Sequence, residues 1–294
     1  MHNFALVSRL FNQSYSFFWS EYDGRRGALE IISITHKWIQ EYLPVTVERL
    51  NLWSDNCSAQ NKNWLFFFFV GWLIYTNRCS MIDLKFLLKG HSFMRPDGVF
   101  GRINTAAKDC NIELPHEWFA PMMQSGTIPN AVAPADFIEF IPLLRGLFTI
   151  RRYDETGVRT DKITTYAWYR FLKNDAGEVV MMVRKEIQEN IPWQTLNIQK
   201  KRGLIHHEVE TLDRPYCVQN ENSWEHVRRE IQLEKQWDLY DLAQEFLSDE
   251  AKQFYFKPTQ NRPTQHHEEI IEADDEITDE NDNTEDLHDL FDSE

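Results

Sequence analysis

Apolar residues recur along residues 1–110 with two different periods, and turn-forming residues separate the stretches. Apolar positions three and four residues apart predict a helix at residues 26–42, which Pro44 ends. A continuously apolar stretch predicts a buried helix at residues 62–78, with Asn61 or Asn63 as its N-cap. The expected order is strands 2–8 and 14–19, helix 26–42, strand 47–53, helix 62–78, strand 81–89 and helix 97–109. This alternation predicts an α/β fold with a mixed sheet flanked by helices.

The pattern changes after residue 125 and again after residue 258, which predicts three parts. Residues 1–125 form the core, residues 126–258 a small β-rich and helical C-terminal extension, and residues 259–294 a disordered acidic tail. The elements expected in the extension are an amphipathic segment at 137–147, strands at 164–171, 179–184 and 191–198, and helix within 224–256. Because the tryptophans follow the apolar periodicity, core packing is expected for Trp19, Trp38, Trp53, Trp64 and Trp72.

The net charge of −15 is concentrated at one end of the chain. Residues 268–294 contain 14 acids and no Lys or Arg, and the preceding residues carry 32 acids against 31 bases. The body is therefore nearly neutral, and its charge alone does not indicate tight nucleic-acid binding. The segment 285–291 alternates acids with large apolar residues, a pattern found both in interaction segments and in solubilising tails.

The four cysteines include no C-x-x-C pair, which argues for a reducing compartment and against a disulfide scaffold or a thiolate zinc site. We therefore expect a nuclear or cytoplasmic protein. Arg9 interrupts the apolar run near the N-terminus, so no signal peptide is predicted. The apolar stretch at residues 64–75 is too short to cross a bilayer, and no membrane association is expected.

Polar side chains follow two of the predicted strands at the point where each strand ends. Strand 47–53 is followed by Asp55 and then by a group of amides and a lysine, namely Asn56, Gln60, Asn61 and Lys62. Strand 81–89 is followed by His91 and Asp97. The carboxyl ends of strands in open α/β sheets are where ligands bind, and carboxylates are the ligands that Mg²⁺ prefers. The sequence thus predicts a Mg²⁺ site built on Asp55 and Asp97, with His91 nearby.

Each of these residues also has a structural explanation. Asp and Asn hydrogen-bond local backbone in turns, which would account for Asp55 and Asn56. The amides before residue 64 are typical of a helix N-terminus. His91 would be a buried histidine with a hydrogen-bond partner, and Arg25 and Arg26 would belong to a solvated face.

Three motifs, with further matches at residues 200–203 and 238–239, carry a similarity that covers most of residues 1–256. The first is W-x-E-x-x-x-x-R-G, from Trp19 to Gly27, and the second is S-D-N-C-x-x-Q-N-K-N, which ends at Asn63. The third, G-H-S-F-x-x-x-D-x-x-F-G-x-I, runs from Gly90 to Ile103. With these motifs the chain resembles a transposase-derived domain-of-unknown-function family that is common in transposon-like reading frames of invertebrate genomes.

The resemblance implies an RNase H-like fold and, in the ancestor, Mg²⁺-dependent cleavage or strand transfer on DNA. It implies catalytic roles for Asp55, Asp97 and His91, of which Asp55 and Asp97 would be metal ligands. Two departures matter here. Asn104 stands where the family has Glu, and the family's first acidic strand lies upstream of residue 1, so the core is expected to lack that strand and its ligand.

We therefore expect residual DNA binding without full catalysis. The residues expected to contact nucleic acid are Arg25, Arg26, Asn56, Gln60, Asn61 and Lys62. The alternative is a protein-interaction module that uses an exposed sheet edge and the acidic tail, with homodimerisation across that edge.

Overall fold

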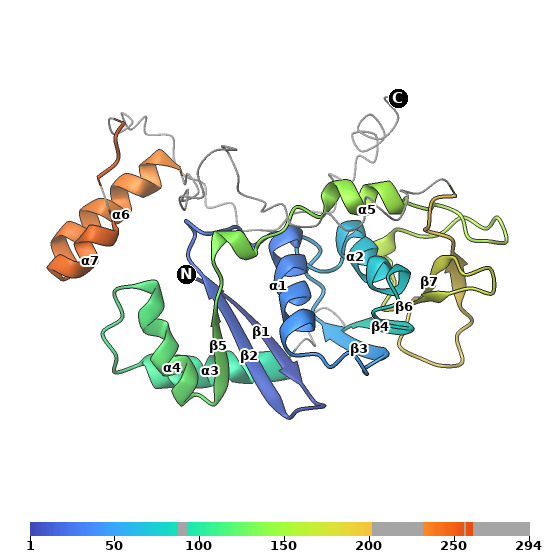
Figure 1. Ribbon diagram of the computed structural model, residues 1–294, viewed down its shortest axis with the longest axis horizontal. Helices are drawn as coiled ribbons and strands as arrows, with labels where there is room; N and C mark the ends of the chain where they lie inside the picture. Colours follow the sequence, from blue (N-terminus) through green and yellow to red (C-terminus); the bar gives the residue numbers. More distant parts are fainter. Residues whose placement is uncertain (88–92, 202–231, 256, 261–294) are drawn as a thin grey trace.

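The computed structural model describes residues 1–87, 93–201, 232–255 and 257–260, and its elements form two mixed sheets flanked by helices (Figure 1). The first sheet has the order β1-β2-β5 and the second the order β3-β4-β6-β7-β8. The strands are β1 (His2–Ser8), β2 (Gln13–Trp19), β3 (Arg49–Ser54), β4 (Met81–Phe86), β5 (Thr127–Ala131), β6 (Trp168–Lys173), β7 (Val179–Arg184) and β8 (Gln194–Leu196). The expectation of an α/β fold with mixed sheets is confirmed.

The helices follow the predicted order closely in the first half of the chain. They are α1 (Ala28–Glu41), α2 (Trp64–Tyr75), α3 (Arg95–Ala107), α4 (Phe119–Gln124), α5 (Ile141–Leu147), α6 (Leu233–Phe246) and α7 (Asp249–Phe254). Three short 3-10 turns, η1 (Pro115–Trp118), η2 (Pro134–Asp136) and η3 (Ile163–Thr165), complete the described elements. The structure describes none of residues 224–231. The rest of the predicted C-terminal helix is divided into α6 and α7, because Ser248 accepts a hydrogen bond from the Ala251 backbone N–H and begins a new helix.

The first sheet is covered on both faces. Strands β1 and β2 form an antiparallel hairpin, and β5 pairs with β2 in parallel. Phe18 on one face of β2 packs with Val99, Ile103 and Met122 from α3 and α4, whereas Phe17 on the other face joins the main core. Strand β5 was not predicted, because Pro129 interrupts its short apolar pattern. A proline is tolerated there since β5 lies at the edge of the sheet.

The second sheet begins with the parallel pair β3 and β4 and continues through antiparallel β6, β7 and β8. Strand β6 lies directly beside β4, so this sheet takes strands from both sides of the expected boundary at residue 125. The predicted strand 164–171 starts later than expected, because the 3-10 turn η3 precedes it.

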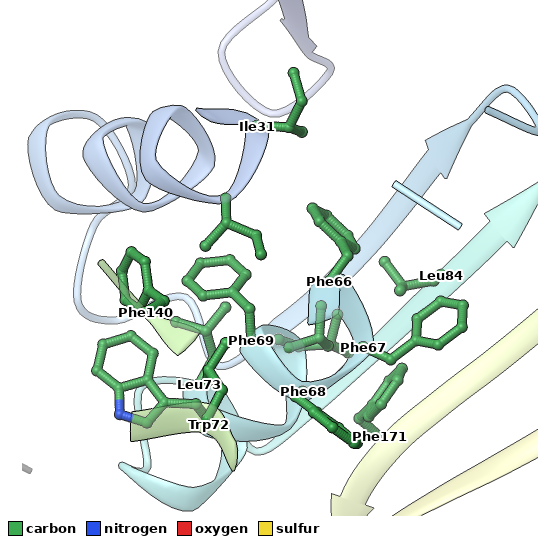
Figure 2. Close-up of a cluster of buried hydrophobic side chains, with 14 of the residues drawn as sticks. Ile31, Phe66, Phe67, Phe68, Phe69, Trp72, Leu73, Leu84, Phe140 and Phe171 are labelled. Carbon is green, nitrogen blue, oxygen red and sulfur yellow. The ribbon is translucent and has the colours of Figure 1, made fainter. Parts of the chain in front are cut away.

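Helix α2 forms the centre of the main core (Figure 2). Phe67 stacks on Tyr169 of β6 with ring centroids 4.6 Å apart, and Phe68 stacks on Phe148 at 5.7 Å. On the opposite side of the helix, Phe69 contacts Phe140 edge to face. A helix that is apolar around its whole circumference is stable only when it is covered on all sides, which agrees with the predicted burial of α2.

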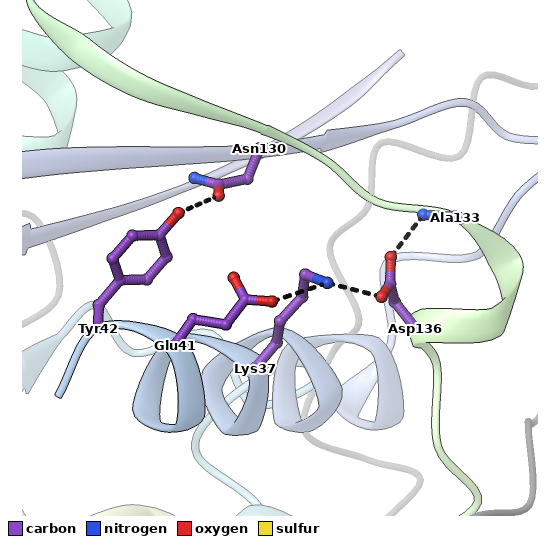
Figure 3. A network of polar contacts seen from close by, with 6 residues as sticks. All are labelled: Lys37, Glu41, Tyr42, Asn130, Ala133 and Asp136. Carbon is purple, nitrogen blue, oxygen red and sulfur yellow. Dashed lines mark hydrogen bonds and ion pairs between the residues drawn. The ribbon is translucent and has the colours of Figure 1, made fainter. Parts of the chain in front are cut away.

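Polar contacts join α1 to the segment that contains β5 (Figure 3). The Lys37 ammonium lies 2.7 Å from Asp136 Oδ1 and 3.1 Å from Glu41 Oε1. The Tyr42 hydroxyl donates a hydrogen bond of 2.6 Å to Asn130 Oδ1. The bonds from Lys37 to Asp136 and from Tyr42 to Asn130 hold α1 against the segment that contains β5, while the apolar face of α1 packs on α2.

One tryptophan departs from the expected core packing. Trp19, Trp38 and Trp72 are buried, and Trp64 packs against the core, but the Trp53 side chain on β3 is 49% exposed. The expectation for Trp53 was wrong because β3 is an edge strand with alternating exposed positions.

The expected acidic tail lies outside the described residues, apart from residues 259 and 260. None of the described helices has the length and apolar character needed to cross a membrane.

The packing of α2 predicts a large loss of stability when one of its central rings is removed. Phe67 is fully buried, so Phe67→Ala should lower the free energy of unfolding by about 3–5 kcal/mol through lost burial and a residual cavity. Urea denaturation followed by circular dichroism measures this change. Leu10→Ala is the control, because Leu10 is 65% exposed and its replacement should change stability by less than about 0.5 kcal/mol. Equal effects of the two variants would contradict the central role of α2.

Candidate functional site

The predicted polar cluster lies at the carboxyl edge of the parallel pair β3 and β4. Ser54 and Phe86 are opposite each other at the ends of these strands, and the Leu87 N–H donates to Ser54 O at 3.1 Å. The loop at residues 55–63 then leads from β3 into α2. We call this loop, together with the ends of the two strands, the carboxyl-edge cluster. Ligands of open α/β sheets bind at this kind of edge.

A tight turn shapes the loop. The backbone N–H groups of Gln60, Asn61 and Lys62 all donate to the Cys57 carbonyl, at 3.3, 3.0 and 3.1 Å. Asn63 then begins α2, because its side chain accepts a hydrogen bond of 2.9 Å from a backbone N–H in the first turn. This confirms Asn63 as the N-cap. The turn places the amide and lysine side chains beside the N-terminus of a helix, which carries partial positive charge.

The carboxylate of Asp55 is exposed and is held by its own loop. Asp55 Oδ1 accepts hydrogen bonds from the Asn61 side-chain amide at 3.1 Å and from the Cys57 N–H at 3.4 Å. Asn61 itself is only 6% exposed, and its amide also donates to Ser54 Oγ at 2.5 Å. Asn61 Oδ1 is buried and has no hydrogen-bond partner among the described residues. Asp55 and Asn61 thus stabilise this turn, which is the structural role that the sequence analysis offered for these polar residues.

Lys62 is the unusual member of the carboxyl-edge cluster. Its side chain is buried at 6% exposure, and its ammonium donates a 2.7 Å hydrogen bond to Asn56 Oδ1 and lies 5.1 Å from the centroid of the Phe86 ring. Asn56 is fixed in turn by a hydrogen bond from its amide to the Leu87 carbonyl. Within the described part of the chain no carboxylate pairs with Lys62. Burial lowers the pKa of Lys62 to about 8.

Arg25 and Arg26 come from the turn before α1, and both are exposed. Burial raises the pKa of the Cys57 thiol; the charge of Asp55 raises it further, whereas the charge of Arg26 lowers it. The charge of Arg26 therefore acts on the carboxyl-edge cluster, although Arg26 precedes β3 in the chain. The Arg25 backbone is structural, because its N–H donates to Glu30 Oε1 and its carbonyl accepts from the Trp19 indole, both at 3.0 Å.

The second predicted acid, Asp97, occupies the first turn of α3. Its Oδ2 accepts a 2.6 Å hydrogen bond from the Met94 N–H, which is a capping role. Asn104 lies on the same helix and is exposed, and His91 falls outside the described residues. Across residues 1–87, 93–201, 232–255 and 257–260, no three His, Cys, Asp or Glu side chains gather in a way that could hold a metal ion. The Mg²⁺ site built on Asp55 and Asp97 stays a prediction.

Fold and site together define an α/β protein with a polar and cationic cluster at the carboxyl edge of a parallel strand pair. The model of one family, "Domain of unknown function (DUF7869)", matches residues 28–189, which is more than half of the chain, and the protein belongs to this family. No curated protein matches the chain. No solved structure matches it either. The matched region runs from the start of α1 beyond the end of β7, so it contains the carboxyl-edge cluster and most of the second sheet.

The environment of Lys62 predicts a pH dependence of stability. The pKa of this lysine is lower in the folded protein, about 8, than its ordinary value of 10.5. Between these two pH values the unfolded chain binds more protons, so the contribution of Lys62 to the free energy of unfolding rises as pH increases from 8 to 10.5. Below pH 8 both states are protonated, and the full cost of burying the ammonium is present.

The measurement is urea denaturation of the wild type and of Lys62→Met at a series of pH values. Methionine keeps most of the length of the side chain without its charge, so the difference between the two proteins isolates the lysine from other titrating groups. The wild type should gain stability relative to Lys62→Met between pH 8 and 10.5. A difference that stays constant over that range would show that the lysine is not buried as a charged group.

Proposed function

We propose that this protein binds nucleic acid through the carboxyl-edge cluster, as an RNase H-like relative of transposon-encoded nucleases that retains binding without a complete metal centre. The observation that carries the proposal is the buried ammonium of Lys62, which has a neutral partner and no paired carboxylate among the described residues. A buried cation without a counter-ion is costly, and an incoming phosphate would supply the missing charge. Lys62 also precedes the N-terminus of α2, which favours anions.

The neighbouring side chains suit phosphate or base contacts. Gln60 presents a side-chain amide at the same turn, and the exposed guanidinium of Arg26 lies close to the loop. Such contacts position a nucleic acid, and they need little net charge on the whole protein. With a nearly neutral body, the binding expected is of the non-specific kind, with a dissociation constant of about 10⁻⁴–10⁻⁶ M at physiological salt.

This proposal predicts that Lys62→Met weakens DNA binding. A hydrogen bond to a charged group contributes about 1.5–3 kcal/mol, so the loss at pH 7 should be at least about tenfold. Wild-type affinity should also fall as pH rises above 8, because the ammonium with a pKa of about 8 then loses its proton. Bound phosphate stabilises the charged form and delays this loss. The Lys62→Met variant should show no such decrease.

Fluorescence anisotropy of a labelled oligonucleotide, with and without Mg²⁺, measures both effects on the full chain. Lys108→Ala is the matched control, because Lys108 is an exposed lysine at the end of α3. Calorimetry with Mg²⁺, using Asp55→Ala as control, examines the ancestral metal site separately. Wild-type protein that binds no oligonucleotide, or a Lys62→Met variant with unchanged affinity, would contradict the proposal.

A second candidate is a protein-interaction module, favoured by the exposed edge of β3. This strand has one neighbour, β4, among the described strands, and Asn51 and Trp53 are exposed along it. An unpaired edge can add a strand from another molecule. Sedimentation at twice the monomer mass, reversed by Asn51→Lys, would support dimerisation through this edge. A monomer at all concentrations would rule out this dimer.

A further inference from the structure

The face of the second sheet opposite α2 carries a row of alternating aromatic and cationic side chains. Cross-strand pairing places Trp53 of β3 opposite Lys85 of β4, Lys85 opposite Trp168 of β6, and Trp168 opposite Arg184 of β7. Among the described helices, α2 packs against this sheet, and in Figure 1 α2 and α5 lie above strands β4 and β6. We call Trp53, Lys85, Trp168 and Arg184, with the adjacent Trp193, the indole–cation face.

The side chains of this face are in direct contact. The Lys85 ammonium lies between two indoles, 5.2 Å from the ring centroid of Trp53 and 4.3 Å from that of Trp168. Trp193 packs edge to face on Trp168 at 4.9 Å, and the Arg184 guanidinium carbon lies 3.9 Å from the Trp193 ring centroid. Cation–π contacts hold the charged groups in place over rings that are otherwise apolar.

Acidic side chains neutralise only part of this charge. Asp83 is buried and accepts two hydrogen bonds from Arg170, at 2.8 and 2.9 Å. The charge of Glu189 also acts on Arg170, since it helps to raise the pKa of that guanidinium. Lys85 and Arg184 have no carboxylate partner in the part of the chain that the structure describes. Lys85 and Arg184 lie on either side of Trp168, and their uncompensated charges favour the binding of an anion.

The buried members of the face also leave polar atoms without partners. Arg184 is 8% exposed and Trp168 is 5% exposed. Arg184 Nε and the Trp168 indole nitrogen are buried and have no hydrogen-bond partner among the described residues, while Arg184 Nη1 donates to the Gln188 carbonyl at 3.1 Å. Arg184 therefore adds a buried positive charge to the same row as Trp53 and Lys85.

Trp53 is the exposed ring at the end of the row. It is 49% exposed, whereas Trp168, on the far side of Lys85 in the same row, is buried. An exposed indole beside a lysine offers two contacts at once, a flat surface for a base and a charge for the neighbouring phosphate. A duplex hides its base faces by stacking, so only an unpaired strand can use both contacts. Trp53 and Lys85, the two accessible members of the row, lie one strand spacing apart, roughly 5 Å, which accommodates one base and its adjoining phosphate.

We propose that the indole–cation face binds single-stranded nucleic acid, with Trp53 stacked on a base, Lys85 at the adjoining phosphate, and Arg184 adding positive potential. This inference rests on the proposed function and specifies its ligand class. Trp53 immediately precedes Ser54 of the carboxyl-edge cluster in the chain.

The test compares binding of a labelled oligothymidine and of a duplex by the full chain, using fluorescence anisotropy. Trp53→Ala should weaken oligothymidine binding roughly 5- to 150-fold, the range that corresponds to the loss of one stacked base. Lys85→Gln should weaken it as well and reduce its salt dependence. Duplex affinity should change little with Trp53→Ala. Because Trp53 is half exposed, its replacement leaves the core intact, and circular dichroism verifies the fold.

The matched controls lie on the other side of the molecule. Phe119 of α4 is an exposed aromatic residue of similar exposure, 45%, and Lys108 is an exposed lysine. Phe119→Ala and Lys108→Ala should leave oligothymidine binding unchanged. Equal losses in these variants and in Trp53→Ala would overturn the inference.

Other outcomes separate this inference from the proposed function. Loss of binding in Lys62→Met, with wild-type affinity in Trp53→Ala and Lys85→Gln, would overturn the indole–cation face and leave the carboxyl-edge cluster standing. No binding of either oligonucleotide by the wild type would overturn both. A peptide of residues 268–294 that binds in a Trp53-dependent manner, when oligothymidine does not, would show that the face recognises acidic peptides instead.

Discussion

Burial of the aromatic helix α2 is the constraint on which the rest of the structure depends. A helix that is apolar on every side must be covered on every side. The second sheet covers one side through Tyr169 and Phe171, and α1 and the segment around Phe140 cover the other. Since the loop at residues 55–63 ends at the N-cap of α2, the same burial fixes the loop between the end of β3 and the start of the helix. The position of Lys62 thus follows from the packing of the phenylalanines.

Much of the fold is visible in the sequence because it rests on local patterns. Helices α1 and α2 follow from apolar spacing, and Asn63 follows from capping preference. Strand β5 is not visible, because Pro129 and Asn130 resemble a loop and only pairing with β2 makes the segment extended. For Trp53, periodicity indicates that the residue lies on a strand, but it cannot tell which face of an edge strand is covered.

In the candidate site too, local sequence patterns predict some features, whereas features that depend on contacts between distant residues are missed. The carboxyl-edge cluster was predicted, since Asp55 and the amides come directly after a strand. The burial of Lys62 was not, because a lysine among amides looks like a solvated residue and the Phe86 ring that covers it comes from another strand. The sequence predicts Asp97 as a metal ligand beside Asp55, and in the structure its carboxylate caps α3. A short polar side chain at a helix start fits both roles, and sequence alone does not distinguish them.

The order in which the strands are completed has a consequence for synthesis of the chain. Strand β2 gains its parallel partner at residues 127–131, and β4 gains its antiparallel partner at residues 168–173. Pairings between segments so distant in sequence form slowly, and exposed aromatic surface favours aggregation until they do. When α2 has just emerged from the ribosome, strands β6 and β7, which cover the phenylalanines of α2, have not yet been synthesised. During translation, this protein therefore passes through an interval in which its most apolar helix is the part that most needs protection by chaperones.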